Sequence, residues 1–116
     1  LGTIGHLAAR IHAVSGARVV GVDTEQSRAD ALRRAGLEAV VAAPDAIADT
    51  VRTLIPDGAD IVVDATGYDG AAEQAMQLAR ETVWDAPTEA PHVRYLVQGS
   101  YPGTVRFPYD TAFRRE

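Results

Sequence analysis

The stretch that decides the fold is Leu1-Gly2-Thr3-Ile4-Gly5, which runs directly into the helical pattern His6-Leu7-Ala8-Ala9-Arg10-Ile11. With one more glycine in front, it would complete the pattern G-x-G-x-x-G, which places a dinucleotide pyrophosphate at a helix N-terminus. In that pattern the second glycine lets the backbone approach the phosphates, and the third lets the helix pack closely on the sheet. The stretch therefore predicts a phosphate-binding loop whose contacts are Gly2, Thr3, Ile4 and Gly5.

Strand and helix patterns alternate along the rest of the chain. Short apolar runs predict buried strands at residues 17–23, 39–42, 60–67 and 93–98. Apolar residues at helical spacing predict helices at residues 4–14, 27–35, 44–56 and 70–82, and residues 84–92 are expected to form a loop. Ser27 with Asp30 resembles a capping box at the start of the second helix. The alternation predicts an α/β fold, a Rossmann-like doubly wound parallel sheet with helices on both faces.

One expected element is missing. A doubly wound sheet begins with a central strand that leads into the glycine loop, and the sequence begins inside that loop. Without this first strand, the sheet would have a gap at its middle. We therefore expect residues 1–116 to form a truncated, partial dinucleotide-binding Rossmann domain of a longer protein.

Composition narrows the classes of partner. The 116 residues suffice for one domain, and the net charge of −5, with no basic cluster, argues against nucleic acid and anionic membranes. The chain has no cysteine, and its histidines (6, 12 and 92) lack the spacing of ligands on one helix, so no metal site is expected. No apolar run approaches the roughly 20 residues of a membrane span and no signal peptide is visible, so a cytoplasmic location is expected.

The carboxyl ends of parallel strands are where such sheets bind ligands. Asp23 ends the second expected strand, about 20 residues beyond the glycine loop, where a carboxylate accepts hydrogen bonds from the adenosine ribose. A carboxylate there also repels a 2′-phosphate, which favours NAD over NADP. The alternative role for Asp23 is to cap the following helix, which Thr24 or Ser27 could do instead. Arg28 keeps NADP open, because a nearby arginine can accommodate the 2′-phosphate.

Two further strand ends are candidate cofactor contacts. Thr66 and Gly67 end one strand, where the backbone would run beneath the cofactor ribose, and Gly99 and Ser100 end the last strand near the nicotinamide. Asp64 lies between apolar neighbours inside a strand, and a buried carboxylate needs hydrogen-bond donors, so a structural role is expected.

The remaining polar and aromatic residues assemble no catalytic set. The tyrosines are too scattered for a stacking platform, Trp84 is expected to shield the loop, and Arg114-Arg115 is expected to be a solvated tail. Catalytic residues are therefore expected outside this chain.

Three motifs together resemble the cofactor domain of the medium-chain, zinc-type alcohol dehydrogenases. They are L-G-T-I-G-H-L-A-A-R (1–10), V-V-G-V-D (19–23) and D-I-V-V-D-A-T-G (60–67). The ending Q-G-S-Y-P-G (98–103) is similar to a narrower branch that includes bacteriochlorophyllide a dehydrogenase.

The resemblance implies a two-domain oxidoreductase that moves hydride between NAD, or alternatively NADP, and a small alcohol or carbonyl substrate. It also implies a homo-oligomeric full-length protein whose zinc ligands lie in a catalytic domain preceding the glycine loop, so the fragment is not expected to be active alone. Carried over, the family's cofactor contacts fall on the loop Gly2 to Gly5 and on Asp23, Thr66, Gly67, Gly99 and Ser100.

Two other function classes remain open from the sequence. One is a nucleotide-binding module that senses NAD without chemistry. The other is a methyltransferase-like domain that binds S-adenosylmethionine, because its glycine loop also precedes an acidic strand end.

Overall fold

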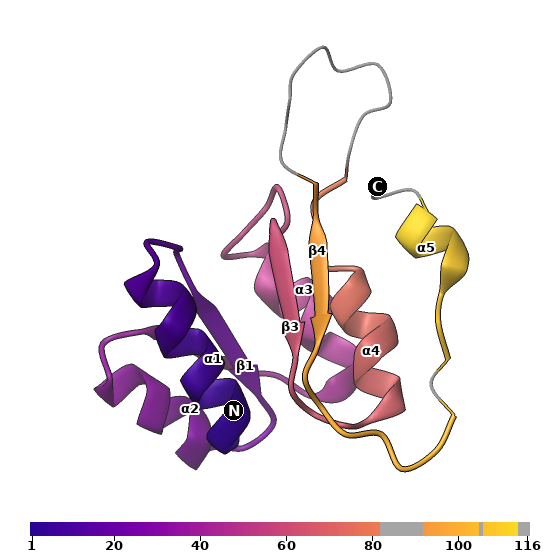
Figure 1. Ribbon diagram of the computed structural model, residues 1–116. Coiled ribbons are helices and arrows are strands. Elements are labelled where there is room, and N and C mark those ends of the chain that lie inside the picture. Colours follow the sequence, from indigo (N-terminus) through magenta and orange to yellow (C-terminus); the bar gives the residue numbers. More distant parts are fainter. Residues whose placement is uncertain (82–91, 105, 114–116) are drawn as a thin grey trace.

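A computed structural model describes residues 1–81, 92–104 and 106–113 of the chain (Figure 1). Strands and helices alternate through most of it. In chain order the elements are α1 (Thr3–Val14), β1 (Val20–Asp23), α2 (Gln26–Arg34), β2 (Glu38–Val41), the 3-10 turn η1 (Pro44–Ala46), α3 (Ile47–Arg52), β3 (Ile61–Asp64), α4 (Asp69–Met76), β4 (Arg94–Val97) and α5 (Tyr109–Phe113). The predicted α/β class is therefore confirmed.

The strands form two parallel pairs. β1 pairs with β2, Asp23 lying opposite Val41, and β3 pairs with β4, Asp64 lying opposite Val97. Among the described residues, these pairs are separate two-stranded sheets rather than one continuous sheet. β1 and β3 do not pair with each other, although both run in the same direction in Figure 1.

The helices and strands form two small apolar cores, and Val22 of β1 and Val40 of β2 also pack against the one beside β3. Ala9 of α1 and Leu32 of α2 pack with Ala39 of β2 in one cluster. Val51 of α3 packs with Val62 of β3 in the other. The helices thus bury apolar residues against the strands.

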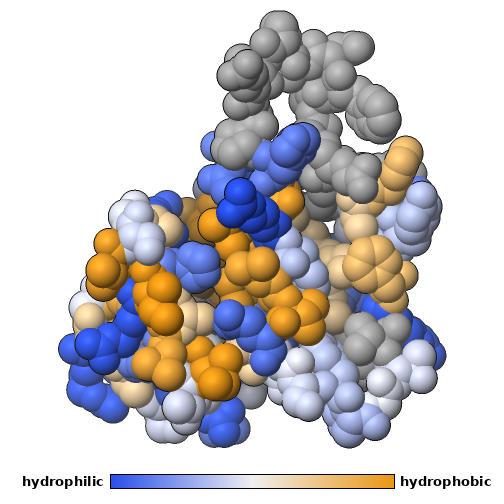
Figure 2. Space-filling view, in the orientation of Figure 1, coloured by the Kyte–Doolittle hydropathy of each residue, from blue (hydrophilic) through white to orange (hydrophobic). Residues whose placement is uncertain are grey.

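Helix α1 forms as predicted, but its large apolar side chains are not buried in this structure. Only Ala8 and Ala9 of the helix are buried, whereas four larger residues are mostly exposed: Ile4, Leu7, Ile11 and Val14. These four recur at helical spacing and therefore share one face. Figure 2 shows hydrophobic side chains gathered over the region of α1.

The end of helix α4 differs from the sequence-based expectation. The helix was expected to continue to residue 82 but ends at Met76. Beyond it, Ala59 forms a parallel β-bridge with Ala79, and the Ala59 amide donates to the Leu78 carbonyl at 2.7 Å. The backbone of Leu78 and Ala79 is therefore occupied by a pairing with a distant segment, which local helical spacing does not reveal.

Other element boundaries also shift. Each strand is four residues long, shorter than three of the predicted runs. Helix α2 begins at Gln26 with Glu25 as its N-cap, so the predicted Ser27 capping box is wrong; Asp30 instead accepts from Gln26 and Arg33. Helix α5 was not predicted. The expected loop over residues 84–92 lies, except for His92, outside the described residues, as do Trp84, Arg114 and Arg115.

Candidate functional site

The candidate site lies at the edge where the strands end and helix α1 begins. Asp23 is the last residue of β1 and Asp64 the last of β3, and the two strands run in the same direction in Figure 1. Gly5, in the first turn of α1, lies against the chain just after β3: a methyl group on Gly5 would be 3.5 Å from the Ala65 Cβ atom. The structure thus brings the predicted phosphate loop next to the end of β3.

The first turn of α1 presents backbone amides outward. Gly2 is the N-cap, and the first intrahelical bond runs from the His6 amide to the Gly2 carbonyl at 2.9 Å. The amides of Thr3, Ile4 and Gly5 precede that bond, so the helix provides no acceptor for them. No acidic residue lies in this turn, and no other heavy atom would come within 4 Å of a methyl group on Gly2. This helix end can therefore accept an anion in close backbone contact.

Asp23 is held in a defined orientation. Its side chain is only 6% exposed, and one oxygen accepts from the Glu25 amide at 2.9 Å. Burial favours a raised pKa for this carboxyl group, whereas the hydrogen bond from the Glu25 amide and the charge of Arg28 favour a lowered one. Asp23 is therefore ionised at neutral pH and can only accept hydrogen bonds.

The residues that follow Asp23 remain at the surface. Thr24 is exposed. Arg28 lies in the first turn of helix α2 with a 56% exposed side chain, and its Nη1 lies 3.8 Å from the nearer Asp23 oxygen. Because this guanidinium borders Asp23, the structure brings together the two residues from which the sequence predicted a preference for NAD and a route to NADP.

The backbone segments that follow β3 and β4 are in close contact. Gly67 has a positive φ of +70°, and a side chain on it would collide with the Ser100 carbonyl oxygen. A side chain on Gly99 would likewise collide with the Gly67 amide nitrogen. Thr66, Gly67, Gly99 and Ser100 are thus in contact as a group, which their separation in the sequence did not reveal.

Asp64 has the structural role that the sequence predicted, with partners that it did not. The residue is 3% exposed; one oxygen accepts from the Thr66 amide at 2.9 Å and from the Thr66 hydroxyl at 2.7 Å. The other accepts from the hydroxyl of Tyr95 at 3.1 Å and from that of Tyr101. From the sequence, the tyrosines were considered only as a stacking platform, and the one signal for their convergence was the need of a buried carboxylate for donors.

These bonds also set the ionisation of the cluster. Burial favours a raised pKa for Asp64, but the hydrogen bonds from Tyr101, Thr66 and Tyr95 more than offset it and lower the pKa below its ordinary value. Burial, together with the neighbouring Asp64 charge, strongly raises the pKa of Tyr95. At neutral pH the cluster is therefore a carboxylate surrounded by neutral donors.

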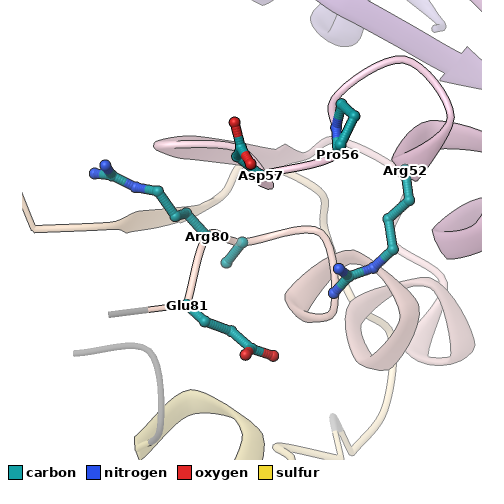
Figure 3. A pocket seen from close by; sticks show the side chains of 6 residues that line it. Arg52, Pro56, Asp57, Arg80 and Glu81 are labelled. Carbon is teal, nitrogen blue, oxygen red and sulfur yellow. The ribbon is translucent and has the colours of Figure 1, made fainter. Parts of the chain in front are cut away.

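Two hollows lie at opposite ends of the β3–β4 pair. A cavity of about 240 Å³ beyond the strand ends is lined by Gly67, Tyr68, Tyr101, Pro102, Gly103 and Thr104. A hollow of about 420 Å³ near the start of β3 is lined by Arg52, Pro56, Asp57, Ala79, Arg80 and Glu81 (Figure 3). In Figure 3 the charged side chains of the larger hollow point in different directions, and Arg52 donates to the Gln77 carbonyl. The smaller cavity is the one that adjoins the candidate site.

The described part of the chain holds no group of three or more histidine, aspartate or glutamate side chains placed to bind a metal ion. Its residues therefore do not fit a zinc centre. Within the same residues, no helix is both long and apolar enough to cross a membrane.

Comparisons with known proteins agree with this geometry. A family model described as zinc-binding dehydrogenase matches residues 3–82, which is more than half of the chain. The crystal structure of AibC is similar with a TM-score of 0.76 and 24% sequence identity; the match covers 97% of this chain and 29% of AibC, and at this identity it supports the fold alone. This chain thus spans less than a third of that structure's length. No curated protein matches the chain. Because the family match includes α1, Asp23 and the end of β3, the chain belongs to the zinc-binding dehydrogenase family.

Proposed function

We propose that this chain is the NAD-binding domain of a zinc-type oxidoreductase that transfers hydride between a nicotinamide and an alcohol or carbonyl substrate. The observation that carries the proposal is the half-buried, ionised Asp23 at the end of β1, close to the open first turn of α1. Together they offer a carboxylate for a ribose and a helix N-terminus for a diphosphate, the two features that an adenine dinucleotide requires.

The pyrophosphate would bind at α1. The free amides of Thr3, Ile4 and Gly5 point along the helix axis, and the helix dipole adds a partial positive charge at this end. Open space at Gly2 leaves room for a phosphate oxygen against the backbone.

The adenosine ribose would bind at Asp23. The hydrogen bond from the Glu25 amide holds the orientation of this ionised carboxylate. In that orientation its oxygens can accept hydrogen bonds from both ribose hydroxyls. The same charge opposes a 2′-phosphate, which supports NAD over NADP. Arg28, 3.8 Å away and more than half exposed, is the residue through which NADP could still bind.

The nicotinamide riboside would lie against the joined ends of β3 and β4, formed by Thr66, Gly67, Gly99 and Ser100. When bound, the nicotinamide would accept or donate the hydride. The four residues would bind and orient the ring, and their backbone would exclude water from one of its faces. The zinc ligands and proton-transfer groups are proposed to belong to another part of the full-length protein, as is the surface that makes it a homo-oligomer.

Titration of NADH fluorescence tests the proposal in the full-length protein. We expect NADH to bind more tightly than NADPH, and Asp23→Ala to weaken NADH binding by about 10- to 100-fold, the range for hydrogen bonds to a charged group. Asp49→Ala, which removes an exposed carboxylate from α3, is the matched control and should leave binding unchanged.

Equal affinity for NADH and NADPH, unaltered by Asp23→Ala, would refute the ribose assignment. Calorimetric titration with S-adenosylmethionine distinguishes the proposed dehydrogenase domain from a methyltransferase-like domain. The latter would bind S-adenosylmethionine and not NADH. A protein that binds NADH but oxidises no alcohol would instead be the NAD-sensing module.

A further inference from the structure

The geometry points to Asp64 as a positioning residue that holds the turn after β3 and the loop after β4 in the arrangement needed by the nicotinamide end of the cofactor. The inference rests on the proposed function, because it concerns the same site. It assigns to Asp64 an effect on one half of the dinucleotide only.

Asp64 connects segments that are far apart in the sequence. Its side chain accepts from Thr66, two residues ahead, and from Tyr101, 37 residues ahead. Its carbonyl oxygen accepts from the amides of Gln98 and Gly99 at 2.7 and 3.0 Å. One residue therefore fixes the exits of both β3 and β4 through its backbone and its carboxylate.

The bonded segments are the ones that carry the candidate nicotinamide contacts. Thr66, held by Asp64, precedes Gly67, and Gly99, also held by Asp64, precedes Ser100. The Thr66 hydroxyl in turn accepts from the Tyr68 amide at 3.1 Å, which extends the ordered turn. Because Gly67 lies in close contact with Gly99 and Ser100, a shift of either segment must displace the other.

The cavity beyond the strand ends depends on the same bonds. Tyr101 lines the cavity of about 240 Å³, and its hydroxyl reaches Asp64. The orientation of the Tyr101 ring is therefore set by the carboxylate, and with it the shape of one cavity wall. Loss of the Asp64 charge would free the ring and the loop that follows it.

Asp64 is suited to positioning rather than to proton transfer. Each of its oxygens already accepts two hydrogen bonds, so the lone pairs of the carboxylate are all engaged and none is left for a substrate. Tyr101 donates its own proton to the carboxylate, so that hydroxyl proton is already engaged. The cluster therefore acts through the geometry of the two loops.

Calorimetric binding of ADP and of NADH to the full-length protein tests the inference. ADP carries the adenosine and the pyrophosphate but lacks the nicotinamide riboside. We expect Asp64→Asn to leave ADP affinity within about twofold of wild type and to weaken NADH binding by about tenfold. Tyr101→Phe, which removes one donor and keeps the ring, should show the same selective loss to a smaller extent.

Asp60→Asn is the matched control, since this acidic residue precedes the same strand at its opposite end with a 63% exposed side chain. It should change neither affinity. Equal weakening of ADP and NADH by both test variants would show a general structural role and overturn the inference, as would unchanged NADH binding in both. A wild-type protein that binds neither ADP nor NADH would instead overturn the proposed function, and this inference with it.

Discussion

Asp23 and Asp64 make the same local turn at the ends of β1 and β3. Each is the last residue of its strand, and each accepts a hydrogen bond of 2.9 Å from the amide two residues ahead, Glu25 and Thr66 respectively. They differ in burial and in further partners: Asp64 also accepts from two tyrosine hydroxyls, whereas Asp23 lies 3.8 Å from the exposed guanidinium of Arg28. We propose that the same turn serves two purposes, with Asp23 binding the ribose and Asp64 ordering the strand ends.

The first prediction concerns acid stability. Because the pKa of folded Asp64 is depressed, its stabilising effect is present above the unfolded pKa of about 3.9 and is lost as the pH falls through the lower folded value. Asp64→Asn should destabilise the protein at pH 7 by about 1.5–3 kcal/mol, the range for hydrogen bonds to a charged group. Urea unfolding at pH 7 and pH 3 checks this: the difference between wild type and variant should shrink at pH 3. A constant difference would show that the charge of Asp64 is not what stabilises the fold.

The second prediction concerns the apolar core beneath α2. Leu32 is fully buried and lies against Gly21 of β1, where any side chain would collide with it. Leu32→Ala should lower the free energy of unfolding by about 2–5 kcal/mol because it leaves a cavity. Leu7→Ala removes the same atoms from a 51% exposed position on α1 and should cost much less. Chemical unfolding of both variants measures the difference, and similar costs would mean that the two sites are equally buried in solution.

The third prediction concerns the contact between the ends of β3 and β4. Gly67→Ala combines a positive φ with a collision against Ser100, whereas Gly36→Ala has a similar φ of +82° and no neighbour within 4 Å. Gly36→Ala should therefore lower the free energy of unfolding by about 1–2 kcal/mol through backbone strain alone, and Gly67→Ala should lower it clearly more. Thermal unfolding of the two variants gives the comparison. Equal costs would indicate that the two loops do not touch.

Local patterns predicted the elements well and their distant contacts poorly. The run from Ile61 to Asp64 is apolar enough to be a strand in any context, and the glycine loop is followed by a helix as expected. Helix α4 stops early because Ala79 pairs with Ala59, a contact that no local spacing encodes.

The candidate site also has one part that the sequence predicted and one part that it did not. Asp23 could be found because it lies at a characteristic distance from the glycine loop along the chain. The convergence of Tyr95 and Tyr101 on Asp64 could not, because it depends on the register of β3 with β4 and on the path of the loop after β4. Sequence reasoning could state only that Asp64 needed partners.

The last prediction concerns the choice between NAD and NADP. Asp23→Ser removes the charge that opposes a 2′-phosphate and leaves Arg28 without its acidic neighbour 3.8 Å away. The guanidinium is then available to a phosphate, for which it forms charge-assisted hydrogen bonds. We expect the ratio of NADPH to NADH affinity to rise by about 10- to 100-fold, measured by fluorescence titration of both cofactors. The double variant Asp23→Ser/Arg28→Ala should lose the gain for NADPH without recovering NADH. If the double variant binds NADPH as well as the single variant does, Arg28 does not contact the phosphate and the preference arises from Asp23 alone.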